Sequence, residues 1–166
     1  MNVKIEQLFS MQDELNTRIV KEHNLENASL SEQRRLAFLV ELGELANETR
    51  CFKYWSKRPA SDKHVILEEY VDGLHFVLSI GLDLGFTKID LPNEVEMQEK
   101  MDKIEINKLF LSLYQWGSKS LSDHDFHAFF NEFLGLGLKL GFSLEEIEAA
   151  YFDKNAVNHE RQDTGY

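Results

Sequence analysis

Residues 37–45 read AFLVELGEL, and residues 65–76 read VILEEYVDGLHF. In both stretches the apolar side chains recur every three or four residues, which is the period of a helix with one buried face. Both stretches also carry acids three residues apart, a spacing that places two carboxylates on the same side of a helix. These acids are Glu41 and Glu44 in the first stretch and Glu69 and Asp72 in the second. The sequence therefore predicts two helices with paired carboxylates at the centre of the fold.

The neighbours of the four acids indicate which way the carboxylates point. Apolar side chains lie within one turn of them, namely Ala37, Phe38, Leu45, Val65, Ile66 and Phe76. All four carboxylates are therefore expected to face inward, where an unpaired charge is costly and no Lys or Arg matches them. Hard oxygen ligands of this kind select Mg²⁺ or Mn²⁺. The sequence predicts a magnesium site with two or more ions, which Mn²⁺ could replace.

A chance origin is the alternative for any single acidic pair, because the chain contains 29 acidic residues. Two pairs on the apolar faces of consecutive helices favour the metal site instead. Two neighbouring acids fit it less well. Glu48 lies one turn beyond Glu44 and is assigned at most as an outer ligand, whereas Glu68 is expected at the surface.

Helical spacing continues through most of the chain, and no β-alternation or repeat interrupts it. The expected helices cover residues 4–22, 29–49, 61–82, 94–118 and 122–141, with a shorter one from 143. Capping-box patterns begin three of them, at Ser29, Ser122 and Ser143. The polar segment 153–166 is expected to lack regular structure. We predict one all-α domain over residues 1–166, an antiparallel helical bundle with a four-helix core plus additional helices.

The composition narrows the classes of partner. The net charge of −11 at pH 7 argues against nucleic acid and anionic membranes. A small phosphorylated substrate stays compatible, because bound metal ions reverse the local potential. The single cysteine, Cys51, cannot form an internal disulfide, as is typical of a reducing cytoplasm. Residues 1–15 lack the apolar core of a signal peptide, and no apolar run reaches the about 18 residues of a membrane span. We expect a cytoplasmic protein.

The acidic pattern resembles that of the all-α nucleotide pyrophosphatase superfamily, which includes MazG and the dimeric dUTPases. This superfamily pairs E-x-x-E on one helix with E-x-x-D on a later helix. Many of its members carry a further Glu before the first pair, where this chain has Val40. Only the shorter motif is therefore present.

Further motifs are similar to those of the dimeric dUTPase branch. They are the base-recognising amides Gln12 and Asn16, the F-K-x-W-x-K loop at residues 52–57, D-x-L-H-F at residues 72–76 and the closing K-x-x-x-N-x-x-R-Q-x-x-G-Y at residues 154–166. The resemblance runs from about residue 8 to the last residue. Residues 94–140 carry no motif that we can match.

This resemblance implies a MazG-like fold, a homodimer and Mg²⁺-dependent hydrolysis of dUTP to dUMP and pyrophosphate, with dUDP as a further substrate. The metal ligands are interpreted as Glu41, Glu44, Glu69 and Asp72. Glu44 is also assigned as the catalytic residue that orients the attacking water. The substrate-binding residues are interpreted as Gln12, Asn16, Lys53, Trp55, His75, Phe76, Lys154, Asn158, Arg161 and Gln162.

The residue types suit these roles. The amides of Gln12 and Asn16 offer donors and acceptors to the edge of uracil, and Trp55 with Phe76 could stack on the base or the deoxyribose. His75 could bind the sugar. The cations in the loop and the tail suit triphosphate oxygens, so the tail is expected to order over the bound nucleotide. Taken singly, the two amides are more typical of solvated or capping positions. Trp55, Phe76 and His75 are as typical of the core, and the cations can equally be solvated surface charges.

The sequence leaves three alternatives open. The first is a related pyrophosphohydrolase that acts on another nucleoside triphosphate, such as dCTP. The second is a di-iron carboxylate bundle, since Asp72-x-x-His75 is similar to its acid-x-x-His element, although Glu44 stands where a second His is needed. The third is a non-enzymatic helical interaction module, which leaves the inward acids unexplained. Apolar residues in 109–116 and 126–138 add weak support for a dimer.

Overall fold

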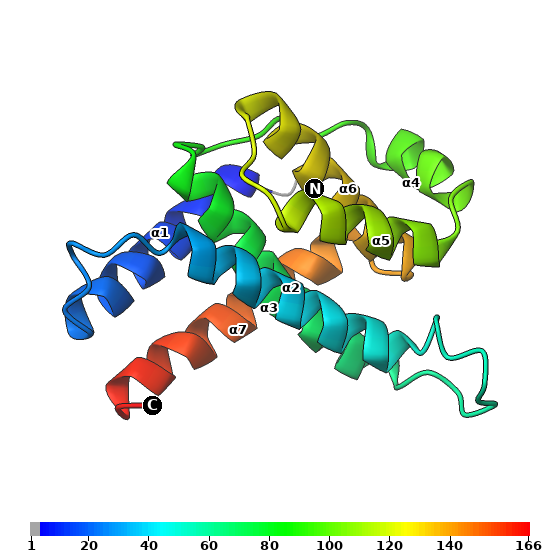
Figure 1. The fold of residues 1–166 in the computed structure, drawn as a ribbon, viewed down its shortest axis with the longest axis horizontal. Coiled ribbons are helices and arrows are strands. Elements are labelled where there is room, and N and C mark those ends of the chain that lie inside the picture. The colour runs from blue at the N-terminus through cyan, green and yellow to red at the C-terminus, as the bar shows by residue number, and fades with distance from the viewer. Residues whose placement is uncertain (1–3) are drawn as a thin grey trace.

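The computed structural model describes residues 4–166, which form seven α-helices and no strand (Figure 1). The helices are α1 (Ile5–Glu22), α2 (Ser31–Thr49), α3 (Lys63–Asp83), α4 (Glu94–Asp102), α5 (Ile106–Gly117), α6 (Asp123–Lys139) and α7 (Leu144–Asp163). The predicted all-α class is confirmed, whereas the detail of a four-helix core stays a prediction. Every helix in the described part of the chain falls short of the length and apolar character that crossing a membrane requires.

The pair α2 and α3 forms the axis of the molecule. The two helices run side by side along its length, and their mutual contact is the most extensive in the fold (Figure 1). Both α1 and α7 pack against α3 and against each other. The helices α4 and α5 each pack on α6, which also contacts α3 and α7. The paired acids of the sequence therefore lie between two helices that are held in place from both sides.

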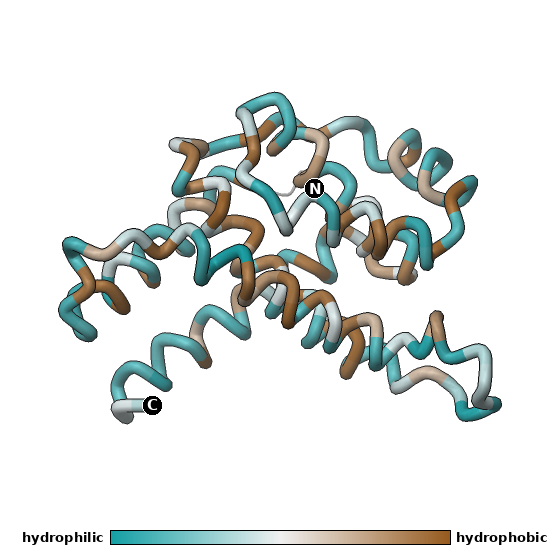
Figure 2. Tube along the Cα trace, in the orientation of Figure 1, coloured by the Kyte–Doolittle hydropathy of each residue, from teal (hydrophilic) through white to brown (hydrophobic). Residues whose placement is uncertain are grey.

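The phenylalanines of α6 fill the core beneath α3. Phe126, Phe129, Phe130 and Phe133 each expose 1% or less of their surface. They approach α3 closely because it carries glycine there: a Cβ at Gly81 would lie 2.5 Å from Cζ of Phe126. Figure 2 shows hydrophobic segments gathered where the helices meet, while the last turns of α7 are hydrophilic.

This packing removes one reason for expecting a dimer. The large apolar residues of 126–138 are buried within the protomer, and in 109–116 only Leu111 is a large apolar side chain that stays mostly exposed. The inference that these two stretches carry surplus apolar groups for a partner surface is therefore wrong. They cover the core of their own chain instead.

Two expected helix boundaries are wrong. The single helix expected over 94–118 is interrupted at residues 103–105, which separate α4 from α5. No Gly or Pro marks this break; both helices pack on α6, and the chain bends to bring each of them there. The capping box expected at Ser29 does not form either. The helix α2 begins at Ser31 after the N-cap Leu30, without a side-chain cap.

The C-terminal segment differs most from its prediction. Residues 153–163 continue α7, so the expectations of a short last helix and of an irregular tail are both wrong. The extension is held by α1: Arg18 donates to the carbonyl oxygen of His159 at 3.2 Å and pairs with Asp163 at 2.5 Å. The capping boxes expected at Ser122 and Ser143 are confirmed.

Candidate active site

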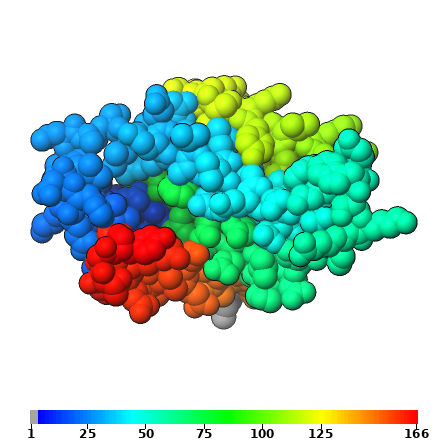
Figure 3. Space-filling view, turned by 60° about the horizontal axis from the view of Figure 1, so that its bottom comes forward, coloured from blue at the N-terminus to red at the C-terminus, as the bar shows by residue number. Residues whose placement is uncertain are grey.

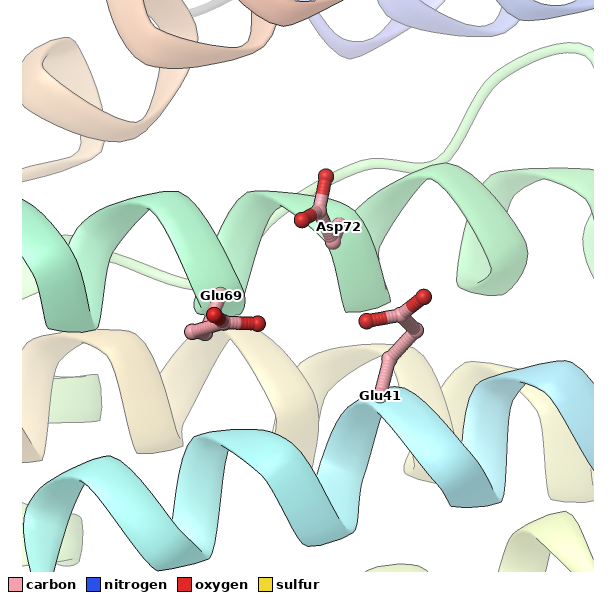
Figure 4. A group of neighbouring side chains, drawn as sticks. All are labelled: Glu41, Glu69 and Asp72. Atoms are coloured by element: carbon pink, nitrogen blue, oxygen red, sulfur yellow. The ribbon is translucent and has the colours of Figure 1, made fainter. Parts of the chain in front are cut away.

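Three of the predicted metal ligands meet between α2 and α3. Glu41 projects from α2 toward Glu69 and Asp72 of α3 (Figure 4). One carboxylate oxygen of each lies within 4.8 Å of the other two, and all three side chains are partly buried. The antiparallel course of the two helices brings the i,i+3 pairs together, as their spacing predicts.

Among the described residues, no cation pairs with the carboxylates of Glu41 and Glu69. Burial, together with the nearby Asp72 and Glu44, raises the pKa of Glu41 from 4.5 to about 7. The buried Oε2 atom of Glu41 has no hydrogen-bond partner among residues 4–166. Burial, followed by repulsion from Asp72, also raises the pKa of Glu69. A divalent cation would supply the missing charge and the missing partner, so the residues present fit a metal ion.

One lysine borders the cluster. Nζ of Lys154, on α7, lies 3.0 Å from Oδ1 of Asp72 and 3.5 Å from Oε1 of Glu68, and only 12% of the Lys154 side chain is exposed. Burial raises the pKa of Asp72 even though Lys154 opposes this change. Lys154 was expected at the phosphates of a nucleotide, and the structure places its ammonium group at the edge of the metal ligands.

The remaining acids differ from the three of the cluster. The expectation that Glu44 faces inward is wrong, since its side chain is exposed. Three residues correspond to 300° of helix rotation, which turns Glu44 about 60° away from Glu41 toward solvent. Glu48 accepts a hydrogen bond from Ser61 beside the cluster. Glu68 is exposed, as expected.

A cavity of about 360 Å³ lies one helical turn from the cluster, between α1, α2, α3 and α7. In Figure 3 it is the hollow bounded by α1 in blue, by α7 in red and by α2, with α3 at its floor. The expected substrate-binding residues that line it are Gln12, Asn16, His75, Phe76, Asn158, Arg161 and Gln162. These seven side chains therefore line one cavity, and their role in binding substrate stays a prediction.

Hydrogen bonds join the polar side chains on the cavity wall. Oε1 of Gln12 accepts from the Tyr151 hydroxyl at 2.8 Å and lies 2.6 Å from Nδ1 of His75. Nε2 of Gln12 donates to Oδ1 of Asn16 at 2.9 Å, and Nδ2 of Asn16 donates to Oγ of Ser79 at 3.0 Å. The Ser79 hydroxyl donates to the carbonyl oxygen of His75 at 2.8 Å. We call this series of hydrogen bonds, from Tyr151 through Gln12, Asn16 and His75 to Ser79, the relay.

Comparison with known families identifies the family of the chain. The sequence matches the family described as dUTPase over residues 4–166. The chain belongs to the dUTPase family. Among curated proteins, no match was found.

Membership in the dUTPase family makes the chain a hydrolase, a dUTP pyrophosphohydrolase with a nucleotide substrate. dUTPases generally use a divalent metal, and the acidic cluster could hold one. The di-iron alternative gains no support from the site. His75, the residue that suggested it, turns Nδ1 toward Gln12 and is absent from the group of potential metal ligands.

Two residues of the dUTPase-type loop stay away from the cavity. Lys53 and Trp55 belong to the segment between α2 and α3, none of which lines the cavity. Trp55 is 64% exposed and contacts Tyr54 edge to face, with ring centroids 5.1 Å apart. The expected stacking pair of Trp55 and Phe76 is therefore not assembled within one chain.

The closing motif of the dUTPase resemblance occupies one side of α7. Lys154, Asn158, Arg161 and Gln162 follow helical spacing and face the cluster or the cavity. Nη1 of Arg161 donates to Oδ1 of Asn158 at 3.4 Å, and its guanidinium lies 4.9 Å from the ring centre of Tyr166. The motif thus acts as a helix face rather than as a loose segment.

Sequence reasoning missed three residues of the site. Tyr151 is fully buried behind Gln12, Ser79 closes the relay, and Arg34 lines the cavity while paired with Asp83. Ser79 stands four residues after His75, and i,i+4 spacing could have pointed to it. Tyr151 had no comparable signal, because a tyrosine on an apolar helix face is usually core.

Proposed function

We propose that the chain hydrolyses dUTP to dUMP and pyrophosphate with Mg²⁺ held by Glu41, Glu69 and Asp72, and by Glu44 at the exposed edge. The observation that carries this proposal is the partnerless buried oxygen of Glu41 facing two further carboxylates, one turn from a cavity of nucleotide size. Two or more Mg²⁺ ions, or Mn²⁺ in their place, would neutralise the phosphates and lower the pKa of water when bound.

The residues around the metal ligands have separate tasks in this proposal. Glu44 lies close enough to Glu41 and Glu69 to raise the pKa of both, yet it is exposed. Its carboxylate is therefore suited to orient a water molecule that arrives from solvent. Lys154 holds Asp72 in the absence of metal. A cation bound by Asp72 would free the ammonium group of Lys154 to contact a phosphate oxygen.

The cavity wall would hold the nucleoside. Amides of Gln12 and Asn16 face the uracil edge, Phe76 stacks on the base or the deoxyribose, and the His75 ring binds the sugar. Asn158, Arg161 and Gln162 on α7 would contact the phosphates. In this proposal the second half of α7 and residues 164–166 close on the ligand. Because Arg18 anchors this segment as a helix, it differs from the expected mobile tail of residues 153–166.

A nucleotide panel tests the activity. The protein is incubated with Mg²⁺ and dUTP, dUDP, dTTP, dCTP or UTP, and pyrophosphate or phosphate release is measured. We expect dUTP to be preferred, dUDP to be a substrate and EDTA to stop hydrolysis. Full activity in the chelator would overturn the metal assignment. Equal turnover of dUTP and dCTP would move the chain to the related pyrophosphohydrolases.

We further propose a homodimer in which the loop of one chain serves the site of the other. Lys53 and Trp55 lie away from the cavity of their own chain, and Tyr54 beside them is 94% exposed. Leu36 and Val40 form an exposed apolar pair one turn apart on α2. Apolar surface of this kind is usually covered by a partner. The expectation of a cytoplasmic protein stays a prediction.

Subunit mixing tests this arrangement. Glu41→Gln removes a metal ligand, whereas Trp55→Ala removes the loop aromatic; each variant alone is expected to be impaired. After the two are unfolded and refolded together, a mixed dimer contains one site with neither defect and should recover part of the wild-type rate. Light scattering that shows a monomer at micromolar concentration, or mixing without recovery, would contradict the shared site.

A further inference from the structure

The hydrogen bonds of the relay run in one direction, from the Tyr151 hydroxyl on one side to the backbone of His75 on the other. Ser79 Oγ donates to the carbonyl oxygen of His75, which can only accept, so the same Oγ accepts from the amide nitrogen of Asn16. Oδ1 of Asn16 must then face Nε2 of Gln12, and Oε1 of Gln12 faces Tyr151. Reversing one amide alone would place two acceptors or two donors against each other, so the amides of Gln12 and Asn16 share one orientation.

The imidazole of His75 obeys the same logic. Since Oε1 of Gln12 can only accept, Nδ1 of His75 carries the proton. Nε2 is therefore an acceptor. It has no partner among the described residues, although His75 exposes only 5% of its surface. Burial, and then the charge of Lys154, lowers the pKa of His75 to about 3, so the ring stays neutral.

The groups that the relay leaves unused form a pattern. One N–H of Gln12, one N–H of Asn16 and the Nε2 acceptor of His75 have no partner within the relay. Uracil presents two carbonyl oxygens on either side of an N–H. Two donors and an acceptor match it, which moves Nε2 of His75 from the sugar to the N–H of the base. Cytosine presents an amino group and a ring nitrogen instead, so an N–H of the protein would meet an N–H of the base.

We infer that Tyr151 is a positioning residue that sets selectivity for uracil over cytosine. Its hydroxyl does not line the cavity, but with the Nδ1 proton of His75 it occupies both lone pairs of Gln12 Oε1. The amide oxygen is thereby held away from the base, and the amide nitrogen is left as donor. This inference rests on the proposed role of Gln12 and Asn16 in base recognition.

The variant Tyr151→Phe removes only the hydroxyl. The ring, which stacks on His75 with centroids 4.4 Å apart, remains in place. Without its hydroxyl donor, Oε1 can rotate toward the amino group of cytosine. The preference for dUMP over dCMP is measured in EDTA as the ratio of their binding constants. We expect this ratio to fall about five- to tenfold, which corresponds to the loss of one hydrogen bond. The ratio of kcat/KM for dUTP and dCTP should narrow equally, mainly through KM.

Tyr70→Phe is the matched control. Tyr70 is also fully buried on a neighbouring element, and its hydroxyl donates to the carbonyl oxygen of Phe133 at 2.8 Å, away from the cavity. This variant should lose stability but keep the wild-type binding ratio. Ser79→Ala, at the other end of the relay, should narrow the ratio as Tyr151→Phe does, and it carries the test if Tyr151→Phe does not fold.

The outcomes separate this inference from the proposed function. If wild-type protein binds dUMP and dCMP equally, the base assignment fails and the inference fails with it. If wild-type protein prefers dUMP and both relay variants keep that preference, only the role of Tyr151 is overturned. A change of ratio in Tyr70→Phe as large as that in Tyr151→Phe would also overturn it, because loss of a buried hydroxyl would then suffice.

Discussion

The relay and the acidic cluster lie one helical turn apart on α3, and they bury polar groups in opposite ways. In the relay a continuous series of hydrogen bonds runs from Tyr151 to the backbone of His75. In the cluster three carboxylates converge, and a buried oxygen of Glu41 has no partner in the described chain. A satisfied network is rigid and keeps its geometry without a ligand. A cluster of like charges is costly until a cation completes it.

This difference matches the two halves of a nucleotide. The neutral base needs fixed donors and acceptors, and these can be prepared by the protein alone. The charged phosphates need a cation. To bind one, the protein must hold several carboxylates close together, and these repel one another while the cation is absent. Substitutions that neutralise a carboxylate of the cluster should therefore lower turnover strongly and raise stability. Substitutions of the cationic side chains beside the cluster should instead lower substrate binding or stability.

The largest effect is expected from neutralising a metal ligand. Glu69→Gln, Asp72→Asn and Glu44→Gln should each lower kcat by at least about a thousandfold, because the metal loses a ligand or the water loses its orientation. Pyrophosphate release from dUTP measures this. Glu68→Gln is the control: it changes the neighbouring residue, which is exposed, and should alter kcat by no more than about twofold.

Stability sharpens the same comparison. Removing one charge relieves repulsion, so metal-free Glu69→Gln should melt at or above the wild-type temperature. Near-normal turnover would show that Glu69 is no ligand. A clear loss of thermal stability would show that the cluster is a structural network like the relay.

A second prediction concerns the phosphate face of α7. Arg161→Ala should lower kcat/KM by about thirtyfold, or ~2 kcal/mol, if its charge-assisted contact to phosphate is lost. Its thermal stability should stay close to wild type. Arg18→Ala should behave in the opposite way, because Arg18 ties α7 to α1 through His159 and Asp163 and does not line the cavity. Equal kinetic loss in both variants would mean that anchoring, rather than phosphate contact, is decisive.

Lys154 offers a smaller test of charge balance. In metal-free protein, Lys154→Met leaves Asp72 without its partner and should reduce the free energy of unfolding by about 1–2 kcal/mol. Saturating Mg²⁺ should remove most of this difference. Lys63→Met is the control, since Lys63 pairs with Glu146 in the open and should change the free energy by less than about 0.5 kcal/mol. A loss that persists unchanged in Mg²⁺ would argue against metal at Asp72.

Local patterns predicted what local physics determines. The helical period and the i,i+3 acids identified α2 and α3 to within two residues and the three carboxylates of the cluster. The capping boxes at Ser122 and Ser143 were equally readable, because a cap involves only residues three apart.

Long-range contacts explain what the sequence did not reveal. The last turns of α7 look too polar for an ordered helix, and they are held by Arg18, about 140 positions earlier in the chain. The break between α4 and α5 follows from packing on α6. Tyr151 acquires its role only where α7 meets α1, and no pattern within α7 announces that meeting.

The last and smallest expected effect concerns pH, to which the two regions respond with opposite sign. The pKa of Glu41 is raised from 4.5 to about 7, so between these values the folded protein holds a proton that the unfolded chain has lost. Its contribution to stability is complete below pH 4.5 and is lost as pH rises through 7. The pKa of His75 is lowered to about 3, so its contribution grows as pH rises toward 6.5.

Comparing wild type with Glu41→Gln cancels the contribution of His75, which both proteins share. In EDTA the melting temperature of wild type relative to the variant should fall by about 2–4 °C between pH 5 and pH 8, which corresponds to about 1 kcal/mol for this partly exposed group. In Mg²⁺ the sign should reverse, because the metal competes with the proton and binds more tightly above pH 7. A difference that is flat with pH in EDTA would show that Glu41 does not carry the repulsion of the cluster.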